Sequence, residues 1–265
     1  MTISTSKPFA LAPHWPSLPA NVGALTTTRR GGVSQAPYDD GEGGGGFNLG
    51  LHVGDDERAV RANRAALGAL LPSEPAWINQ VHGAAVADAA ARRDGEPAPV
   101  ADASVADRAG VVCAVLTADC LPVLFADRAG TMVGAAHAGW RGLAAGVLQE
   151  TVAAMRGRGA ADITAWLGPA IGPRQFEVGA DVLEAFVDQA AADGRVQARA
   201  CFVARPGHPG KYLADIFGLA RLALARAGVT DVWGGEHCTV TERGTFYSYR
   251  RDKVTGREAT LIWLR

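Results

Sequence analysis

The segment of residues 111–150 constrains the fold more than any other part of the chain, because short apolar runs alternate there with compact turns. The apolar runs 121–126 and 131–137 lie on either side of the turn residues 127–130. Two short apolar runs around a tight turn that contains glycine predict an antiparallel β-hairpin. A third apolar run, residues 111–116, precedes the hairpin and predicts another strand.

The predicted hairpin brings a cysteine and a histidine together. With the turn centred between Arg128 and Ala129, Cys120 faces His137. Directly opposed side chains in an antiparallel pair have Cβ atoms about 4.5–5.5 Å apart. A thiol and an imidazole at that separation either bind a metal or act as a nucleophile and its base. We therefore expect the chemistry of the chain at this hairpin.

Composition limits the class of protein. A chain of 265 residues with 48% apolar and 20% charged residues is typical of a globular protein that buries a real core. The net charge of −1, without a basic block, argues against nucleic acid as a partner. No apolar run approaches the roughly 18 residues that a membrane span requires. The four cysteines follow no disulfide spacing and no secretory signal is visible, which favours a cytoplasmic enzyme with reduced thiols.

The order of the predicted elements indicates the fold class. Proline-rich residues 1–20 read as an N-terminal segment that leads into a single catalytic domain of residues 21–265, because neither a repeat nor a linker divides the rest. Strands and helices mix without strict βαβ alternation, so we expect an α+β fold of layered mixed sheets. Neither the dinucleotide-binding glycine motif nor a Walker motif is present.

Three further elements concern the site. Residues 77–83 predict a strand that ends at His82, and apolar spacing over residues 143–155 predicts a helix directly after the hairpin. Residues 246–251 and 258–264 predict a C-terminal hairpin, with Arg250 near its turn.

His82, Cys120 and His137 are the candidate metal ligands. One thiolate and two imidazoles suit a single Zn²⁺ with three protein ligands and a water in the open fourth position, the catalytic arrangement. Zinc would lower the pKa of that water to about 7. Metal-free catalysis, with Cys120 as nucleophile and His137 as base, is the rival interpretation. The third interpretation makes all three ordinary structural residues, as a lone histidine at a strand end usually is.

The residues after His137 suggest an anion site. The turn Ala138-Gly139-Trp140-Arg141 leads into the predicted helix, and free N–H groups at a helix N-terminus favour negative charge. Arg141 would add to that effect. Arg30, which precedes two glycines, suits a second anion-binding turn, although a solvated surface turn is the more common reason for such a pattern.

Five ordered blocks resemble a known family. The blocks NQVHG, TADCLPVLFAD, AAHAGWRG, LGPAIGPRQFEVG and FYSYRRDKVTGR are similar to those of the YfiH family, also called the laccase-domain or polyphenol-oxidase-like family, from about residue 24 to the C-terminus. The resemblance implies layered sheets, related to the cysteine-hydrolase-like fold of cytotoxic necrotising factor toxins. It also implies a zinc site at His82, Cys120 and His137. The glycine-rich loop 41–46 departs from the family's shorter link.

The resemblance offers several activities. Family members are described as purine nucleoside phosphorylases with adenosine deaminase and methylthioadenosine phosphorylase activity, as multicopper polyphenol oxidases, and as peptidoglycan editing factors. A multicopper oxidase needs on the order of ten histidine ligands besides its cysteine. This chain has 6 histidines, which argues against copper.

The expected function is therefore a zinc-dependent purine nucleoside phosphorylase that acts on adenosine, inosine and methylthioadenosine and also deaminates adenosine. Its partners would be a nucleoside and phosphate, in a monomer or weak dimer. Phosphate would be held at Arg141 with help from Arg30 or Arg250. The remaining polar candidates contact the ribose or the base: Asn48, Gln80 and Asp119. The alternatives are an amidase that edits a peptidoglycan precursor, a polyphenol oxidase, and a redox or scaffold protein with a vestigial zinc site.

Overall fold

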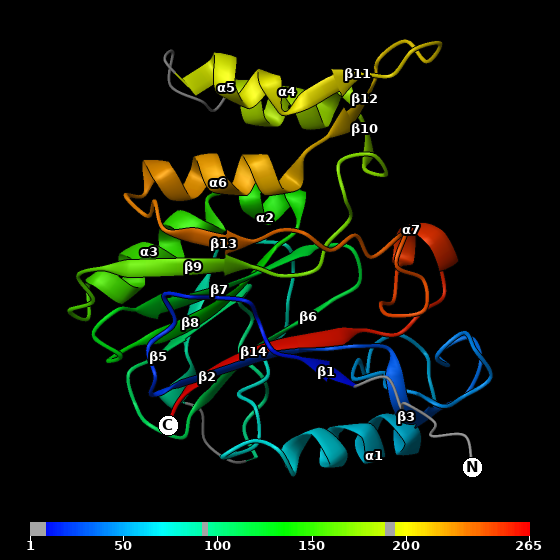
Figure 1. The fold of residues 1–265 in the computed structure, drawn as a ribbon, viewed down its shortest axis with the longest axis vertical. Coiled ribbons are helices and arrows are strands. Elements are labelled where there is room, and N and C mark those ends of the chain that lie inside the picture. The colour runs from blue at the N-terminus through cyan, green and yellow to red at the C-terminus, as the bar shows by residue number, and fades with distance from the viewer. Residues whose placement is uncertain (1–8, 92–94, 189–193) are drawn as a thin grey trace.

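Two β-sheets face each other in the computed structural model, which describes residues 9–91, 95–188 and 194–265 (Figure 1). The smaller sheet has the order β1 (Ala10–Leu11), β2 (Val22–Thr27), β14 (Glu258–Leu264) and β6 (Val112–Thr117). The larger sheet has the order β13 (Val232–Gly234), β9 (Ile163–Leu167), β7 (Leu121–Asp127), β8 (Val133–Ala138), β5 (Ala103–Ala106) and β4 (Val86–Asp88).

Strand directions are mixed in the larger sheet. β13 pairs with β9 and β4 with β5 in parallel, both at the sheet edges, whereas the pairs between them are antiparallel. The smaller sheet is antiparallel throughout. The predicted layered α+β fold with mixed sheets is confirmed.

Burial on both faces explains the apolar sequences of the central strands. Every residue of β6 and β7 is buried, since the two sheets pack on each other and helices cover their outer faces. Strands enclosed on both faces read as nearly continuous apolar runs. The core between the sheets includes Val115 of β6, Leu124 of β7 and Ile262 of β14.

Helices cover the outer faces of both sheets (Figure 1). α1 (Glu57–Gly68) covers the smaller sheet, where Leu67 packs in one cluster with Leu261. α3 (Val147–Arg156) and α6 (Ile216–Arg226) cover the larger sheet. Beyond α6 lies a third layer, made of the strands β10 (Glu177–Gly179), β12 (Lys211–Ala214) and β11 (Phe202–Ala204) with the helices α4 (Ala180–Val187) and α5 (Arg195–Ala200).

The N-terminal segment contacts both sheets over its described part, residues 9–20. β1 pairs with β2, and the Nε1 of the buried Trp15 donates a hydrogen bond of 2.9 Å to Thr164 Oγ1 in β9. Within the described chain, no helix has the length and apolar character to span a bilayer.

The predicted hairpin is present, but its predicted register is wrong. β7 and β8 pair with Pro122, not Cys120, opposite His137. The turn is centred one residue later than expected, because Gly130 takes the left-handed position (φ 68°) and donates to Asp127 O. A change of two residues in the partner leaves each side chain on its predicted face of the sheet. Cys120 therefore still lies on the His137 face, just before β7 begins.

Three other predicted elements are corrected. The helix after the hairpin is two helices, α2 (Trp140–Ala144) and α3, because Gly146 between them has φ 92°. Residues 77–83 form no strand, and Asn79 makes one isolated bridge to Val100. Residues 246–251 form no strand; Ser248 caps the short helix α7 (Tyr249–Asp252), and β14 pairs with β2 and β6. The alternating aromatic residues there favoured a strand, and the serine cap outweighed them.

Candidate active site

The fold brings His82, Cys120 and His137 together. His137 lies in β8, Cys120 ends the short connection from β6 to β7, and His82 lies in the irregular segment 77–83. Their three ligand atoms all lie within 4.8 Å of one another. Cys120 Sγ is 3.8 Å from His82 Nε2, and the two imidazole rings meet edge to face with centroids 4.8 Å apart.

Two of the residues that build this group have an unusual backbone. His82 and Asp119 have positive φ angles of 61° and 86°. Such angles are uncommon for residues other than glycine and cost free energy, so they persist where surrounding contacts impose them. At Asp119 those contacts are hydrogen bonds of 2.6 Å to its carboxylate from the Thr239 hydroxyl and from the backbone N–H of Arg250. The same bonds fix the direction in which the following residue, Cys120, points.

Asp102 holds both histidines, a role that no sequence pattern indicates. Its buried carboxylate lies 2.8 Å from His137 Nδ1 and accepts the backbone N–H groups of Val81, His82 and Gly83. Since Nδ1 of His137 donates to Asp102, its Nε2 is left to face Cys120 and His82. An aspartate two strands from the cysteine thus sets the orientation of one histidine and the position of the other.

The group is electrostatically coupled. Burial alone would raise the pKa of Cys120, but His137 beside it outweighs burial and lowers that pKa to about 6. Burial likewise opposes the charging of His137, and the Cys120 thiolate together with Asp102 raises the pKa of His137 to about 9. Cys113, buried without such a partner, has its pKa raised to about 12. Cys120 is therefore poised as a thiolate.

The donor set fits one zinc ion. Zn–N and Zn–S bonds place the ligand atoms of a tetrahedral site roughly 3.3 to 3.6 Å apart, close to the spacing of this group. The carboxylate that holds His137 Nδ1 is the partner that zinc-binding histidines usually have. When bound, the metal would supply Lewis acidity and lower the pKa of a water in the cleft.

Gly139 makes room for the group. A Cβ atom at this position would lie 2.9 Å from Cys120 Sγ and 3.0 Å from His82 Cδ2. Both distances are shorter than a carbon normally tolerates, so the glycine before α2 is a steric requirement of the site.

The group opens into a cleft of about 900 Å³. His52, Arg64 and Arg257 contribute the other basic side chains, and no aspartate or glutamate lines it among the residues described. Apolar walls come from Leu51, Trp77 and Tyr249. A cleft of this size, mostly apolar with a few convergent polar groups, suits a small organic substrate.

The polar residues nominated for ribose or base are engaged with the protein. Gln80 lines the cleft, but its amide bonds both the N–H and the C=O of Leu116. The Asp119 carboxylate accepts hydrogen bonds from the Thr239 hydroxyl and from the backbone N–H of Arg250. Asn48 is fully buried, and its Oδ1 accepts the backbone N–H of Arg257 at 2.9 Å.

The three arginines nominated for phosphate do not line the cleft. Arg30 pairs with Glu42 at 2.9 Å and also donates to Gly244 O. The exposed Arg141 lies over the Trp140 ring, 4.4 Å from its centroid. Arg250 donates to backbone carbonyls of the 175–177 segment. Arg257, in the same family-like block as Arg250, lines the cleft instead and was missed.

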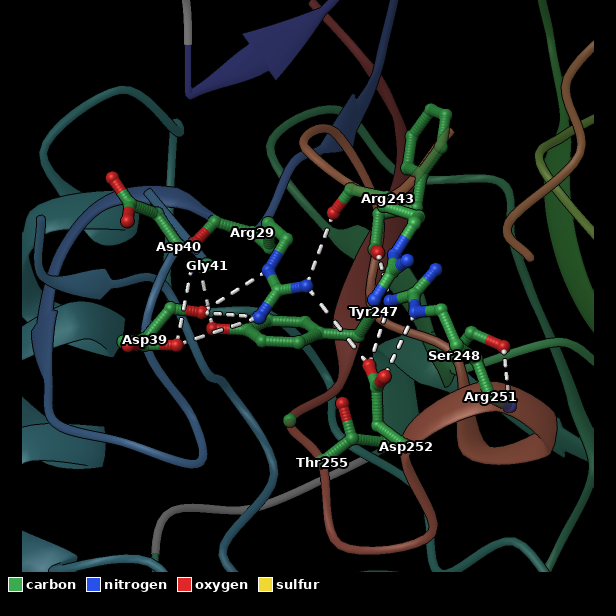
Figure 2. Close-up of polar contacts among 12 residues, drawn as sticks. Arg29, Asp39, Asp40, Gly41, Arg243, Tyr247, Ser248, Arg251, Asp252 and Thr255 are labelled. Atoms are coloured by element: carbon green, nitrogen blue, oxygen red, sulfur yellow. Dashed lines mark hydrogen bonds and ion pairs between the residues drawn. The ribbon is translucent and has the colours of Figure 1, made fainter. Parts of the chain in front are cut away.

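A separate arginine cluster supports α7 (Figure 2). Arg29 donates to Asp39 O through Nε and Nη2 and to Arg243 O through Nη1. Arg251 forms two hydrogen bonds to the Asp252 carboxylate, which lies 4.0 Å from Arg29. Because these guanidinium groups are occupied by the protein, the cluster is structural. It fixes the helix whose first residue, Tyr249, forms a wall of the cleft.

Comparison with known proteins identifies the family. Residues 23–265 match the family model described as multi-copper polyphenol oxidoreductase laccase. Purine nucleoside phosphorylase YfiH of Shigella flexneri is 54% identical over 258 residues, which cover 96% of this chain and 98% of the relative. The chain belongs to the YfiH family. The Escherichia coli member is 53% identical with the same coverage.

Solved structures agree with this family assignment. A crystal structure from Neisseria meningitidis superposes with a TM-score of 0.86 at 52% identity, covering 97% of this chain and 99% of that one. The Bacillus licheniformis YfiH structure gives a TM-score of 0.81 at 30% identity, with 92% and 93% coverage. The resemblance read from the five sequence blocks is confirmed.

The copper in the family description finds little support in this member. Over the described residues, a single group of three or more potential metal-ligating side chains is found, and it holds two histidines. A trinuclear cluster with a separate mononuclear copper requires several times that number.

Proposed function

We propose that this YfiH-family member is a zinc-dependent purine nucleoside phosphorylase that acts on adenosine, inosine and methylthioadenosine and also deaminates adenosine. One observation carries the proposal: the His82–Cys120–His137 group and the guanidinium groups of Arg64 and Arg257 line one cleft. A nucleoside and a phosphate ion both fit within about 900 Å³.

The relatives support the reaction class. Those from Shigella flexneri, Escherichia coli and Pseudomonas aeruginosa, between 51% and 54% identical, are named purine nucleoside phosphorylases. In this chain the described lining of the cleft has no carboxylate, so it does not repel phosphate.

The residues of the cleft have different roles in binding. Tyr249, about half exposed at the rim, offers an aromatic face for a purine. Asp102 keeps His137 in one tautomer and anchors the turn that carries His82. The metal, when bound, supplies Lewis acidity at this wall, and the arginines supply positive charge for the anion.

Product identification tests the proposal. Purified protein of measured zinc content is incubated with adenosine, inosine or methylthioadenosine, with and without phosphate. We expect phosphate-dependent release of the free base with ribose 1-phosphate or its methylthio analogue, and ammonia from adenosine. Cys120→Ala should abolish these products, whereas Cys201→Ala, at a half-buried thiol elsewhere, should not. Zinc-loaded protein that releases no base from any nucleoside would refute the proposal.

The Asp102–His137–Cys120 alignment favours one alternative, an amidase that uses Cys120 as nucleophile. A muropeptide amide is the substrate that tests it. Hydrolysis that survives removal of zinc and is lost in Cys120→Ala would support the amidase and count against the metal-dependent proposal.

A further inference from the structure

Arg257 enters the cleft with part of its guanidinium group uncommitted. Its Nη1 donates to the carbonyls of Thr255 and Gly256, at 3.0 and 2.9 Å. Its Nε and Nη2 have no hydrogen-bond partner among the residues that the structure describes. A half-buried guanidinium that lines a cleft and retains unused donors can bind an oxyanion.

The segment of residues 48–50 forms the seat of Arg257. Asn48 Oδ1 accepts its backbone N–H at 2.9 Å, and the N–H of Leu49 donates to its backbone carbonyl at 3.1 Å. A Cβ atom on Gly50 would lie 2.8 Å from Arg257 Cγ. The Asn-Leu-Gly sequence therefore combines a buried side-chain acceptor with the one residue small enough to let the arginine stem pass.

The same segment holds a second arginine. Arg64 Nε donates to Leu49 O at 2.9 Å, and its guanidinium lies over the Trp77 ring at 4.2 Å from the centroid. Next along the chain is His52, whose pKa is lowered by partial burial, then by Arg257 and by Arg64. Both guanidinium groups thus act on one corner of the cleft.

We propose that Arg257 and Arg64 form the oxyanion subsite that holds inorganic phosphate for phosphorolysis, an assignment that rests on the proposed function. A phosphate oxygen bonds to C1′ of the nucleoside as the bond from C1′ to the purine nitrogen breaks. The purine leaves with the electron pair and takes up a proton, and the sugar 1-phosphate is the other product. Arg30, Arg141 and Arg250 are replaced in this role because their guanidinium groups lie outside the cleft.

Steady-state kinetics of the zinc-loaded protein test the subsite. A hydrogen bond to a charged group contributes about 1.5–3 kcal/mol, so Arg257→Met should raise the KM for phosphate by at least about tenfold. The KM for inosine should change by less than about twofold. Arg257→Lys should recover part of the loss, since lysine restores the charge without the planar fork. Arg61→Met, one turn before Arg64 on the exposed face of α1, is the matched control.

Two rival variants make the test decisive. Arg141→Met or Arg250→Met, if either raised the KM for phosphate in place of Arg257→Met, would overturn the assignment. Gly50→Ala should reproduce the phosphate defect without removing a charge, because its methyl group displaces the arginine stem. Circular dichroism and zinc content establish that each variant is folded and loaded.

Equilibrium dialysis of labelled orthophosphate, without nucleoside, separates this assignment from the proposed function. Wild-type protein should bind phosphate, and Arg257→Met should bind it at least about tenfold more weakly. Phosphate binding that depends on Arg257, in a protein that releases no base, would refute the phosphorylase and leave the subsite standing. Equal binding by both proteins would overturn the subsite. Adenosine 5′-monophosphate is the second probe: Arg257-dependent binding of the nucleotide without binding of orthophosphate would overturn the assignment to a free phosphate cosubstrate.

Discussion

Asp102 Oδ1 lies 2.8 Å from Nδ1 of His137, and the same oxygen accepts the backbone N–H of His82 at 2.9 Å. One buried carboxylate oxygen therefore connects two of the three potential metal ligands. Because the two histidines come from segments more than fifty residues apart, this contact converts a sheet position and a loop position into one rigid unit.

Replacing Asp102 should weaken metal binding before it affects folding. In Asp102→Asn the amide cannot serve the His137 N–H and the three backbone N–H groups of residues 81–83 as a carboxylate does. We expect zinc affinity to fall by about 10- to 100-fold, measured by competition with a chromophoric chelator. Asp88→Asn, which removes a surface ion pair on β4, is the control. Unchanged zinc affinity in Asp102→Asn would show that the carboxylate does not position the ligands.

Gly139→Ala should disrupt the site selectively. The added methyl group would sit 2.9 Å from Cys120 Sγ, so the thiol or His82 must move. We expect a loss of zinc affinity and of catalytic activity. Gly68→Ala, at a helical position where a Cβ meets nothing within 4 Å, should leave both unchanged. A zinc-binding, fully active Gly139→Ala protein would contradict the steric argument.

The cysteines should differ in reactivity in metal-stripped protein. Alkylation requires the thiolate, and the pKa of Cys120 is lowered to about 6, whereas burial raises that of Cys113 to about 12 and that of Cys201 to about 11. Iodoacetamide at pH 7 should modify Cys120 ahead of those two, as mapped by peptide mass spectrometry. Its rate should be half-maximal near pH 6, and added zinc should protect it. Equal labelling of the three thiols would refute this order.

Glu258 should make the protein less stable as pH rises. It is fully buried, and burial followed by the nearby Asp119 raises its pKa well above the ordinary value of 4.5. The folded state keeps the proton that the unfolded chain releases above 4.5, so the stabilisation is complete below that pH and declines as the pH rises. Glu258→Gln should therefore lose less stability than wild type between pH 5 and pH 8 in urea unfolding. Parallel curves for the two proteins would exclude this role, and the exposed Glu74→Gln serves as the control.

Local patterns were sufficient to predict the centre of the fold. Apolar runs around a glycine turn indicated the β7–β8 hairpin, and the error of one residue in the turn centre was harmless because it kept Cys120 on the His137 face. The error at residues 246–251 was not harmless, because the predicted type of element was wrong. Aromatic residues favoured a strand there, but the Ser248 side chain, which accepts the backbone N–H of Arg251, caps a short helix instead.

The groups that complete the site depend on contacts that no local pattern records. Asp102 directly precedes the ordinary-looking strand β5, and its four hydrogen bonds form only when the fold brings residues 81–83 and 137 to it. Arg257 is similarly held in place by contacts with residues 48–50, which lie about two hundred positions earlier in the chain. Sequence patterns weigh arginines by their neighbours along the chain, and so they favoured those beside glycines, a helix start or a predicted turn instead.

Cys120 stands in the short link that crosses from the smaller sheet to the larger one, since β6 belongs to the first and β7 to the second. The two histidines reach it from the side of the larger sheet, through Asp102 and β8. A shift of one sheet over the other therefore strains the short link that carries the sulfur. Substitutions in the core between the sheets, far from any substrate, should consequently change the pKa of the Cys120 thiol and the affinity for metal.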